Sequence, residues 1–260
     1  MEKPNEKTAQ IEKALEFALE KNEFIINYQP VFDLHKKKWA SVEALLNWKH
    51  TSLGQIQPDI FIPLAEKNDL IIPIGYWVLK TVCQQIAKWG PTIQHDFKLL
   101  VNVSPSQLRN DLFVFLTDLL EITKIPAHSL ELEITESAMI TDAQESNTTI
   151  NKIKKMGIRL AIDDFGTGFS CFSRLRNFPI DSLKIDKSFI HEVTTNPSDA
   201  IIVRTMIRLG KELGLNVIAE GVENEEQFQF LIDNDCPQAQ GFYLCEPKNG
   251  EDITEFFRKI

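Results

Sequence analysis

The sequence predicts an α/β fold, a (β/α)₈ barrel whose first strand runs antiparallel to the others. The 260 residues are 43% hydrophobic and 25% charged, which suits one domain large enough to enclose a barrel core. Short apolar stretches alternate with longer helical stretches, as in parallel βα units. Only residues 33–38 separate the first two strands, a link too short for a crossover helix, so these two strands should be antiparallel.

The expected elements follow the chain in this rhythm. Ile11, Leu15 and Leu19 recur every four residues and predict an amphipathic helix before the first strand. Strands are expected at residues 24–30, 39–46, 98–103, 130–135, 159–164, 182–185, 216–221 and 239–244. Helices are expected at residues 59–68, 74–89, 106–121, 143–156, 198–213 and 225–234. No linker, repeat or low-complexity tract divides the chain.

Composition narrows the class of protein. The net charge of −9 argues against a nonspecific nucleic-acid binder but permits an anionic substrate, because bound divalent cations reverse the local field. The cysteines form no C-x-x-C pair or compact framework, which indicates reduced thiols and a cytoplasmic protein; they are Cys83, Cys171, Cys236 and Cys245. The N-terminus lacks the apolar region of a secretory signal, and no apolar run approaches the roughly 18 residues of a membrane span. This leaves open whether a longer natural protein carries membrane segments outside this chain.

Acidic or amide side chains stand where the predicted strands end. They are Glu43, Asn102, Glu133, Asp163, Asp164 and Glu220, with Lys184 inside the sixth strand. The carboxyl ends of barrel strands meet at one rim, and several buried carboxylates converge only where cations neutralise them. Each residue alone would be read as a solvated loop residue or a helix N-cap. Their coincidence on several strands predicts a metal site.

The donor set also indicates which metal binds. Carboxylates with one amide oxygen are hard donors that suit Mg²⁺ or Mn²⁺. The five histidines, at positions 35, 50, 95, 128 and 191, cluster nowhere, which argues against zinc. Asp163 and Asp164 are adjacent and placed to bridge or flank two cations, the arrangement that activates water for displacement at phosphorus. The sequence therefore predicts phosphoester hydrolysis.

The stretch from Asp163 to Ser170 reads D-D-F-G-T-G-F-S. Its two glycines allow a tight turn after the strand, so that the loop lies close to a metal or substrate. The D-F-G triplet invites comparison with protein kinases, but no Gly-rich loop, V-A-I-K or H-R-D motif accompanies it. A plain Gly-rich turn is the alternative, and the Asp163–Asp164 pair favours the metal interpretation.

Seven motifs occur in order from about Ile11 to Phe257. They are Glu43-Ala-Leu45, Asn102-Val-Ser104, Glu133-Ile-Thr-Glu-Ser137, Asp163-Asp-Phe-Gly-Thr-Gly168, Leu183-Lys-Ile-Asp186, Ala219-Glu-Gly-Val-Glu223 and Gln240-Gly241. Together they resemble the EAL family of bacterial cyclic di-GMP phosphodiesterases. The resemblance implies a modified TIM barrel over residues 11–260, after an N-terminal extension of residues 1–10. It also implies hydrolysis of cyclic di-GMP to linear pGpG with two Mg²⁺ or Mn²⁺ ions.

The resemblance further implies roles for individual residues. Glu43, Asn102, Glu133 and Asp163 would hold one metal, and Asp163 would be shared with a second metal that Asp164 also binds. Glu220 would lie beside the metals as ligand or water-orienting base. Lys184 would position the attacking water or stabilise charge at phosphorus, and Glu136 would anchor the loop from Phe165 to Gly168.

Other readings of these positions stay open. Lys184 is also consistent with a surface lysine, although its apolar strand favours a partnered cation. Glu136 is equally consistent with a capping-box acid, and Glu223 is better read as a helix N-terminal acid than as a ligand. Gln240 is assigned to a water on the metals or, alternatively, to a barrel-interior amide. Gln29 is assigned to substrate contact.

One position departs from the family pattern. Glu-x-Leu-x-Arg reads here as Glu43-Ala-Leu45-Leu46-Asn47, so the arginine expected to contact a substrate phosphate is missing, although Leu46 and Asn47 keep their place among the substrate-binding candidates. Losing a charge-assisted hydrogen bond costs roughly 1.5 to 3 kcal/mol, about ten- to a hundredfold. The change weakens the expected grip on substrate and leaves the expected metal site untouched.

Three hypotheses follow for function. The first and favoured one is an active phosphodiesterase, because each matched metal position keeps a competent residue. The alternatives are a receptor that binds cyclic di-GMP without cleaving it and a protein-interaction module, and Asn47 favours these two. Family members often dimerise and are often fused to sensor or diguanylate cyclase domains. A homodimer and such partner domains outside this chain therefore remain open.

Overall fold

The computed structural model describes residues 6–89, 97–136, 144–167, 175 and 178–259. Its strands are β1 (Phe24–Asp33), β2 (Lys38–His50), β3 (Gly54–Ile56), β4 (Lys98–Asn102), β5 (Leu130–Thr135), β6 (Arg159–Phe165), β7 (Ser182–Ile185), β8 (Asn216–Ala219) and β9 (Gln238–Ala239). Its longer helices are α1 (Glu6–Ala18), α2 (Pro58–Lys67), α3 (Ile71–Trp89), α4 (Asn110–Thr123), α6 (Gln144–Lys155), α9 (Pro197–Leu213), α10 (Glu225–Asp233) and α11 (Gly250–Arg258). Shorter turns are α8 (Lys187–His191), η2 (Pro105–Gln107) and η3 (Ala127–Ser129).

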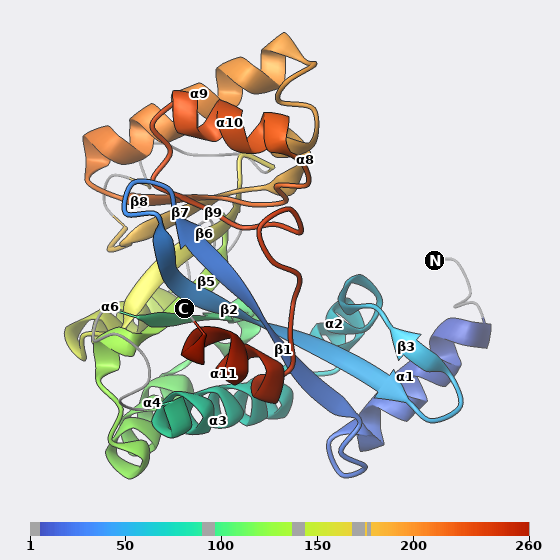
Figure 1. The fold of residues 1–260 in the computed structure, drawn as a ribbon. Helices are drawn as coiled ribbons and strands as arrows, with labels where there is room; N and C mark the ends of the chain where they lie inside the picture. The colour runs from blue at the N-terminus through green and yellow to red at the C-terminus, as the bar shows by residue number, and fades with distance from the viewer. Residues whose placement is uncertain (1–5, 90–96, 137–143, 168–174, 176–177, 260) are drawn as a thin grey trace.

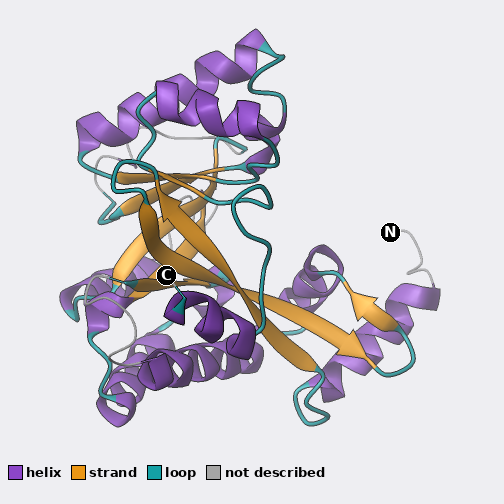
Figure 2. Ribbon diagram, viewed as in Figure 1, coloured by secondary structure: helices purple, strands orange, loops and turns teal. Residues whose placement is uncertain are grey.

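The sheet closes on itself. Its order is β1-β9-β8-β7-β6-β5-β4-β2-β3, and an additional β1–β2 pairing joins the two sides. β1 runs antiparallel to both of its neighbours, β2 and β9, whereas the pairs from β2–β4 round to β8–β9 are parallel. Helices surround this barrel (Figures 1 and 2). The predicted (β/α)₈ barrel with a reversed first strand is confirmed.

The last barrel strand is shorter than the sequence predicts. Residues 239–244 were expected as a strand, but β9 covers only Gln238–Ala239. A Cβ atom on Gly241 would lie 2.1 Å from the backbone oxygen of Val222, so the chain passes against the turn after β8 at a point where only glycine fits. That close approach takes the chain out of the sheet. β8 likewise ends at Ala219, which leaves Glu220 just beyond the strand.

The β1–β2 hairpin continues beyond the barrel. β2 pairs with β4 only from Ser41 to Ala44, and its later residues pair with β1 and with the short strand β3. Figure 1 shows α1 and α2 beside this projecting part of the hairpin. We call residues 6–27 and 45–67 the hairpin extension. Trp48 is its centre, with ring centroids 5.8 Å from Phe24 and 5.6 Å from Phe61.

Hydrophobic side chains fill both sides of the barrel wall. Two large clusters pack the outer faces of the strands against the helices. A third, small cluster of Val31, Leu100 and Ile218 lies inside the barrel, as the alternation of these strands requires. We call these three residues the septum. Cys83, Cys236 and Cys245 are free buried thiols, while Cys171 lies outside the described residues. No helix within the described ranges is long and apolar enough to cross a membrane.

Candidate functional site

The predicted acidic and amide residues converge inside the carboxyl end of the barrel. β2, β4, β5 and β6 present Glu43, Asn102, Glu133 and Asp163, and Glu220 follows β8. Hydrogen bonds and ion pairs connect all five to one another or to Lys184. We call these five residues with Lys184 the rim cluster. The predicted meeting of strand-end residues is therefore observed in the structure.

Lys184 is the centre of the rim cluster. Its side chain is fully buried on β7, and its Nζ lies 2.6 Å from Glu220 Oε1 and 2.7 Å from Glu133 Oε1. The same nitrogen is 3.1 Å from Asp163 Oδ1 and 3.3 Å from Glu43 Oε2. The reading of Lys184 as a surface lysine is wrong. One ammonium faces four carboxylates, so buried negative charge remains in excess.

Amide side chains crosslink the same carboxylates. Asn102 Nδ2 donates to Glu43 Oε1 at 3.0 Å and to Glu133 Oε2 at 3.2 Å. Gln240 Nε2 donates to Glu43 Oε2 at 2.7 Å and to Gln29 Oε1 at 2.9 Å. Gln29 Nε2 in turn donates to the backbone oxygen of Cys245 at 3.1 Å. Gln29 and Gln240 are thus both buried in the barrel interior, beside the rim cluster.

The excess of negative charge shifts the pKa values of the cluster. Burial, together with the neighbouring carboxylates, raises the pKa of Glu133 well above its usual range and that of Glu220 to about 8. Burial would also raise the pKa of Glu43, but Lys184 and the Gln240 amide hold it below its usual value. Burial would lower the pKa of Lys184, yet the four surrounding carboxylates raise it well above normal. The ammonium therefore stays charged while part of the carboxylate charge is suppressed.

Asp164 stands beside the cluster with a strained backbone. Its φ is 54°, in the left-handed region, and its backbone N–H donates to Asp163 Oδ1 at 3.0 Å. Burial and the nearby charges of Asp163 and Asp186 raise the pKa of Asp164 to about 6. Asp186 was not among the predicted site residues. Its place in the Leu183-Lys-Ile-Asp186 motif, just after β7, was the available signal.

The donor set fits divalent cations. Ligand atoms of Asp163, Asp164 and Glu220 all lie within 4.8 Å of one another. The buried atoms Glu133 Oε1 and Lys184 Nζ have no hydrogen bond of acceptable geometry, although they are an ion pair. An amide rotated by half a turn occupies the same space, so Asn102 offers either Nδ2 to the carboxylates or Oδ1 to a cation. Hard oxygen donors in excess of local positive charge suit Mg²⁺ or Mn²⁺.

Glu136 contacts the loop that follows Asp164. Its Oε2 accepts a hydrogen bond from the backbone N–H of Gly166 at 3.2 Å, while its Oε1 is buried without a hydrogen-bond partner. Gly166 has φ of 100°, and a Cβ atom there would lie 2.3 Å from the Met206 side chain. The structure therefore places Glu136 where loop anchoring requires it. Gly168, the other glycine of the motif, lies outside the described residues.

The remaining substrate-binding candidates lie farther along β2. Asn47 shares its strand face with Glu43, and its amide is engaged locally, donating to Leu45 O at 3.1 Å and accepting from Gln55 Nε2 at 3.3 Å. Leu46 faces the opposite side and packs against the larger hydrophobic cluster. The structure therefore brings neither residue into the rim cluster.

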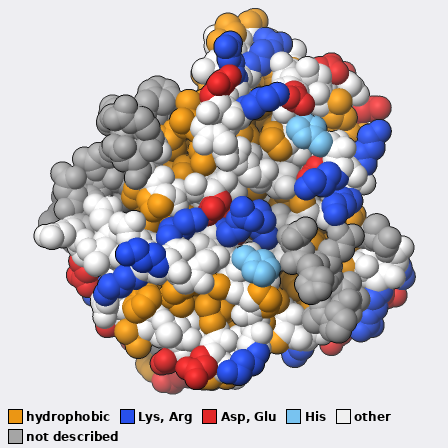
Figure 3. Space-filling model, turned by 90° about the vertical axis from the view of Figure 1, so that its left-hand side faces the viewer, with side chains coloured by type: hydrophobic (Ala, Val, Ile, Leu, Met, Phe, Trp, Pro, Cys, Tyr) orange, Lys and Arg blue, Asp and Glu red, His pale blue; other side chains and the backbone are white. Residues whose placement is uncertain are grey.

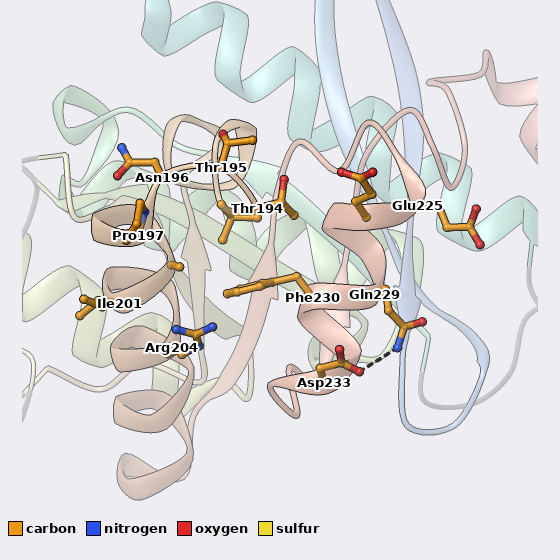
Figure 4. A pocket seen from close by; sticks show the side chains of 13 residues that line it. Thr194, Thr195, Asn196, Pro197, Ile201, Arg204, Glu225, Gln229, Phe230 and Asp233 are labelled. Atoms are coloured by element: carbon orange, nitrogen blue, oxygen red, sulfur yellow. Dashed lines mark hydrogen bonds between the residues drawn. The ribbon is translucent and has the colours of Figure 1, made fainter.

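A groove elsewhere on the surface was not foreseen from the sequence. It lies between α9 and α10, holds about 730 Å³, and has Arg204 over the Phe230 ring at 5.1 Å (Figure 4). Gln229 donates to Asp233 at 2.8 Å along its wall. No residue of the rim cluster lines this groove. The chemistry-bearing residues named above thus lie at the barrel rim and not in this groove.

Comparison with known proteins gives a consistent picture. The protein-family model described as EAL domain matches residues 12–247. The bifunctional diguanylate cyclase/cyclic di-GMP phosphodiesterase MucR of Pseudomonas aeruginosa is 40% identical over 238 residues, which are 91% of this chain and 35% of MucR. A relative from Synechocystis sp. is 40% identical over 248 residues, 95% of this chain and 36% of that protein. The chain therefore spans about a third of the length of these curated relatives.

Solved structures agree with the sequence matches. The PaMucR phosphodiesterase in complex with c-di-GMP has a TM-score of 0.89 and 38% identity, covering 94% of this chain and 99% of that one. The EAL domain of Mycobacterium smegmatis DcpA has a TM-score of 0.77 and 34% identity, covering 91% of this chain and 98% of that one.

Proposed function

Because this chain belongs to the EAL domain family, we propose that it is a metal-dependent phosphodiesterase that hydrolyses cyclic di-GMP to linear pGpG. The similarity to MucR and to a structure that holds c-di-GMP supports the choice of substrate. The proposed domain covers residues 11–260 after an extension of residues 1–10, and the proposed compartment is the cytoplasm. The single observation that carries the proposal is the buried excess of carboxylates around Lys184.

The residues of the rim cluster divide the work. Glu43, Asn102, Glu133 and Asp163 would hold one Mg²⁺ or Mn²⁺ ion, and Asp163, Asp164 and Glu220 would hold a second. When bound, the ions supply activation of water and neutralisation of phosphate charge. Alternatively, Glu220 would lie beside the metals and orient the attacking water as its base. Lys184 remains protonated and stabilises the negative charge that develops at phosphorus.

Amides and the loop position these groups. Gln240 fixes Glu43 and Gln29 through one amide nitrogen, and Gln29 lies next to the proposed substrate end of the barrel. Glu136 holds the backbone of Gly166, which fixes the turn that carries Asp164. These contacts keep the carboxylates in place before substrate arrives, so little reorganisation is needed during the reaction.

A turnover assay tests the proposal. The purified chain with Mg²⁺ or Mn²⁺ should convert cyclic di-GMP to pGpG. Chromatography of the nucleotides measures this conversion. Ca²⁺ should not support turnover, because its looser coordination suits water activation poorly. Full activity with Ca²⁺ alone would contradict the two-metal mechanism.

A receptor for cyclic di-GMP is the second candidate, and Asn47 favours it. A neutral amide, already bonded to Leu45 and Gln55, replaces the arginine of the family pattern. Tight binding of cyclic di-GMP without product would establish the receptor. If the chain neither binds nor cleaves cyclic di-GMP, the protein-interaction module is the remaining hypothesis.

A further inference from the structure

The amino end of the barrel has a polar mouth of its own. Six inward-facing polar side chains meet there, from six different strands: Asp33, Lys98, Glu131, Arg159, Asn216 and Gln238. Five of them, all except Glu131, line a hollow of about 440 Å³. The septum separates this hollow from the rim cluster, and no rim-cluster residue lines it. We call it the amino-end mouth.

Positive charge predominates in this mouth although the chain carries a net −9. Lys98 and Arg159 come from β4 and β6, Lys36 comes from the β1–β2 turn, and Lys38 begins β2. Figure 3 shows the face with Lys and Arg side chains gathered near its centre and histidine beside them. Only Asp33 among the lining residues is acidic, and Glu131 lies behind Lys98 at 3.3 Å. Among the described lining residues, four are therefore basic and one is acidic.

The donors of the mouth are not fully used by the protein. The Nε atom of Arg159 is buried without a hydrogen-bond partner, and its nearest carboxylate oxygen, on Asp181, is 4.0 Å away. Asp181 is already held by Lys154 at 2.6 Å. A buried donor of this kind is normally satisfied, so the mouth is suited to a polar occupant.

We propose that the amino-end mouth binds a small phosphate-bearing ligand. Its cations come from the β1–β2 turn and from the strands β2, β4 and β6, so they can contact several oxygens of one phosphate group from different sides. Trp39 and Phe97 line the same hollow and offer apolar surface to the organic part of such a ligand. The site is independent of cyclic di-GMP hydrolysis, because it lies on the other side of the septum.

Calorimetric titration with inorganic phosphate tests the site. The full chain is kept in chelator, so that no divalent ion at the rim cluster contributes. We expect saturable binding in the millimolar range or tighter, weaker binding of malonate, and a change of Trp39 fluorescence that is lost in Trp39→Phe. Malonate binding as tightly as phosphate would overturn the assignment to phosphate.

Matched variants locate the binding. Arg159→Gln and Lys36→Gln should each weaken phosphate binding about tenfold, the usual effect of one charge-assisted contact. Lys80→Gln, an exposed position on α3 with the same charge change, should leave it unchanged. An equal loss in Lys80→Gln, or no saturable binding by the unaltered chain, would overturn the proposal. Thermal melts confirm that each variant is folded, and turnover is not used as a readout.

Discussion

The two mouths of the barrel are built from the same alternating strands, yet they balance charge differently. At the carboxyl end, four carboxylates share the single ammonium of Lys184 within 3.3 Å. At the amino end, each carboxylate has its own cation: Glu131 has Lys98 at 3.3 Å, and Asp33 has Lys36 at 3.5 Å. No carboxylate at the amino end is left without a cation, so this end needs no further positive charge. Carboxylates in excess of cations do need it, and this excess distinguishes the candidate metal site from the amino end.

The largest expected effect comes from replacing one carboxylate at each end of the barrel with an amide of the same shape. Asp163→Asn should lower cyclic di-GMP turnover by about 10²- to 10³-fold or more, because it removes a charged ligand from the reacting centre. Asp181→Asn, at the amino end, should leave turnover unchanged. Nucleotide chromatography measures both. Retained activity in Asp163→Asn would remove that carboxylate from the proposed mechanism.

Removal of the buried ammonium is the next largest effect. Lys184→Met should destabilise the metal-free protein by about 3–5 kcal/mol, because it leaves buried carboxylates unpaired. Saturating Mg²⁺ or Mn²⁺ should restore part of this stability, as measured by denaturant unfolding. Lys98→Met leaves Glu131 unpaired at the other end and should not be rescued by the same ions. Equal rescue of both variants would contradict the contrast between the two mouths.

Asn47 tests whether the carboxyl end lacks only its grip on phosphate. Asn47→Arg should improve the affinity or turnover of cyclic di-GMP by about ten- to a hundredfold, because a guanidinium makes a charge-assisted hydrogen bond. Asn47→Gln is the matched neutral control and should bring no such gain. If Asn47→Arg behaves like the control, the missing arginine is not what limits this site.

The most gradual expected effect is the pH dependence of metal binding. The pKa of Glu220 is raised from 4.5 to about 8, so the folded state holds a proton that the unfolded state has lost. Stability of the metal-free protein should therefore fall as pH rises from about 5 to 8. A cation displaces this proton, so Mn²⁺ affinity should rise by up to about tenfold per pH unit in that window. The measurement is the difference in melting temperature with and without Mn²⁺ at several pH values. This difference should increase with pH in the unaltered chain and depend less on pH in Glu220→Gln.

Much of the barrel could be predicted from the sequence, because its strands are short apolar runs between long helical stretches. The reversed first strand followed from the brevity of the β1–β2 link alone. The strand β3 was missed, since three residues carry no periodic pattern. The end of β9 was placed wrongly because the apolar run at 242–244 looks like strand, whereas the close passage of Gly241 past Val222 depends on tertiary contact.

The carboxyl-end residues were found because acidic residues at strand ends are conspicuous. The distances from four of them to Lys184 could not be predicted from the sequence, because they depend on how the strands tilt round the barrel. The amino-end mouth was missed for another reason. Lys98 and Arg159 stand four residues before Asn102 and Asp163, so period-two alternation already placed them on the inner face. Read singly, each looked like an ordinary charged residue at the start of a strand.

The β1–β2 hairpin gives the molecule a mechanical connection. Its ladder is unbroken from the Phe24–Trp48 pair to the Val31–Ser41 pair, and the Gln29–Glu43 pair lies within it, toward the barrel end. The first register shift comes only between Val31 and Phe32. A hydrogen-bonded hairpin of this kind is stiff along its length. A displacement of the hairpin extension would therefore be transmitted to Glu43, where the hairpin joins the barrel. A partner that displaced α1 or α2 would shift Glu43 relative to Glu133, because no loop between them absorbs the motion.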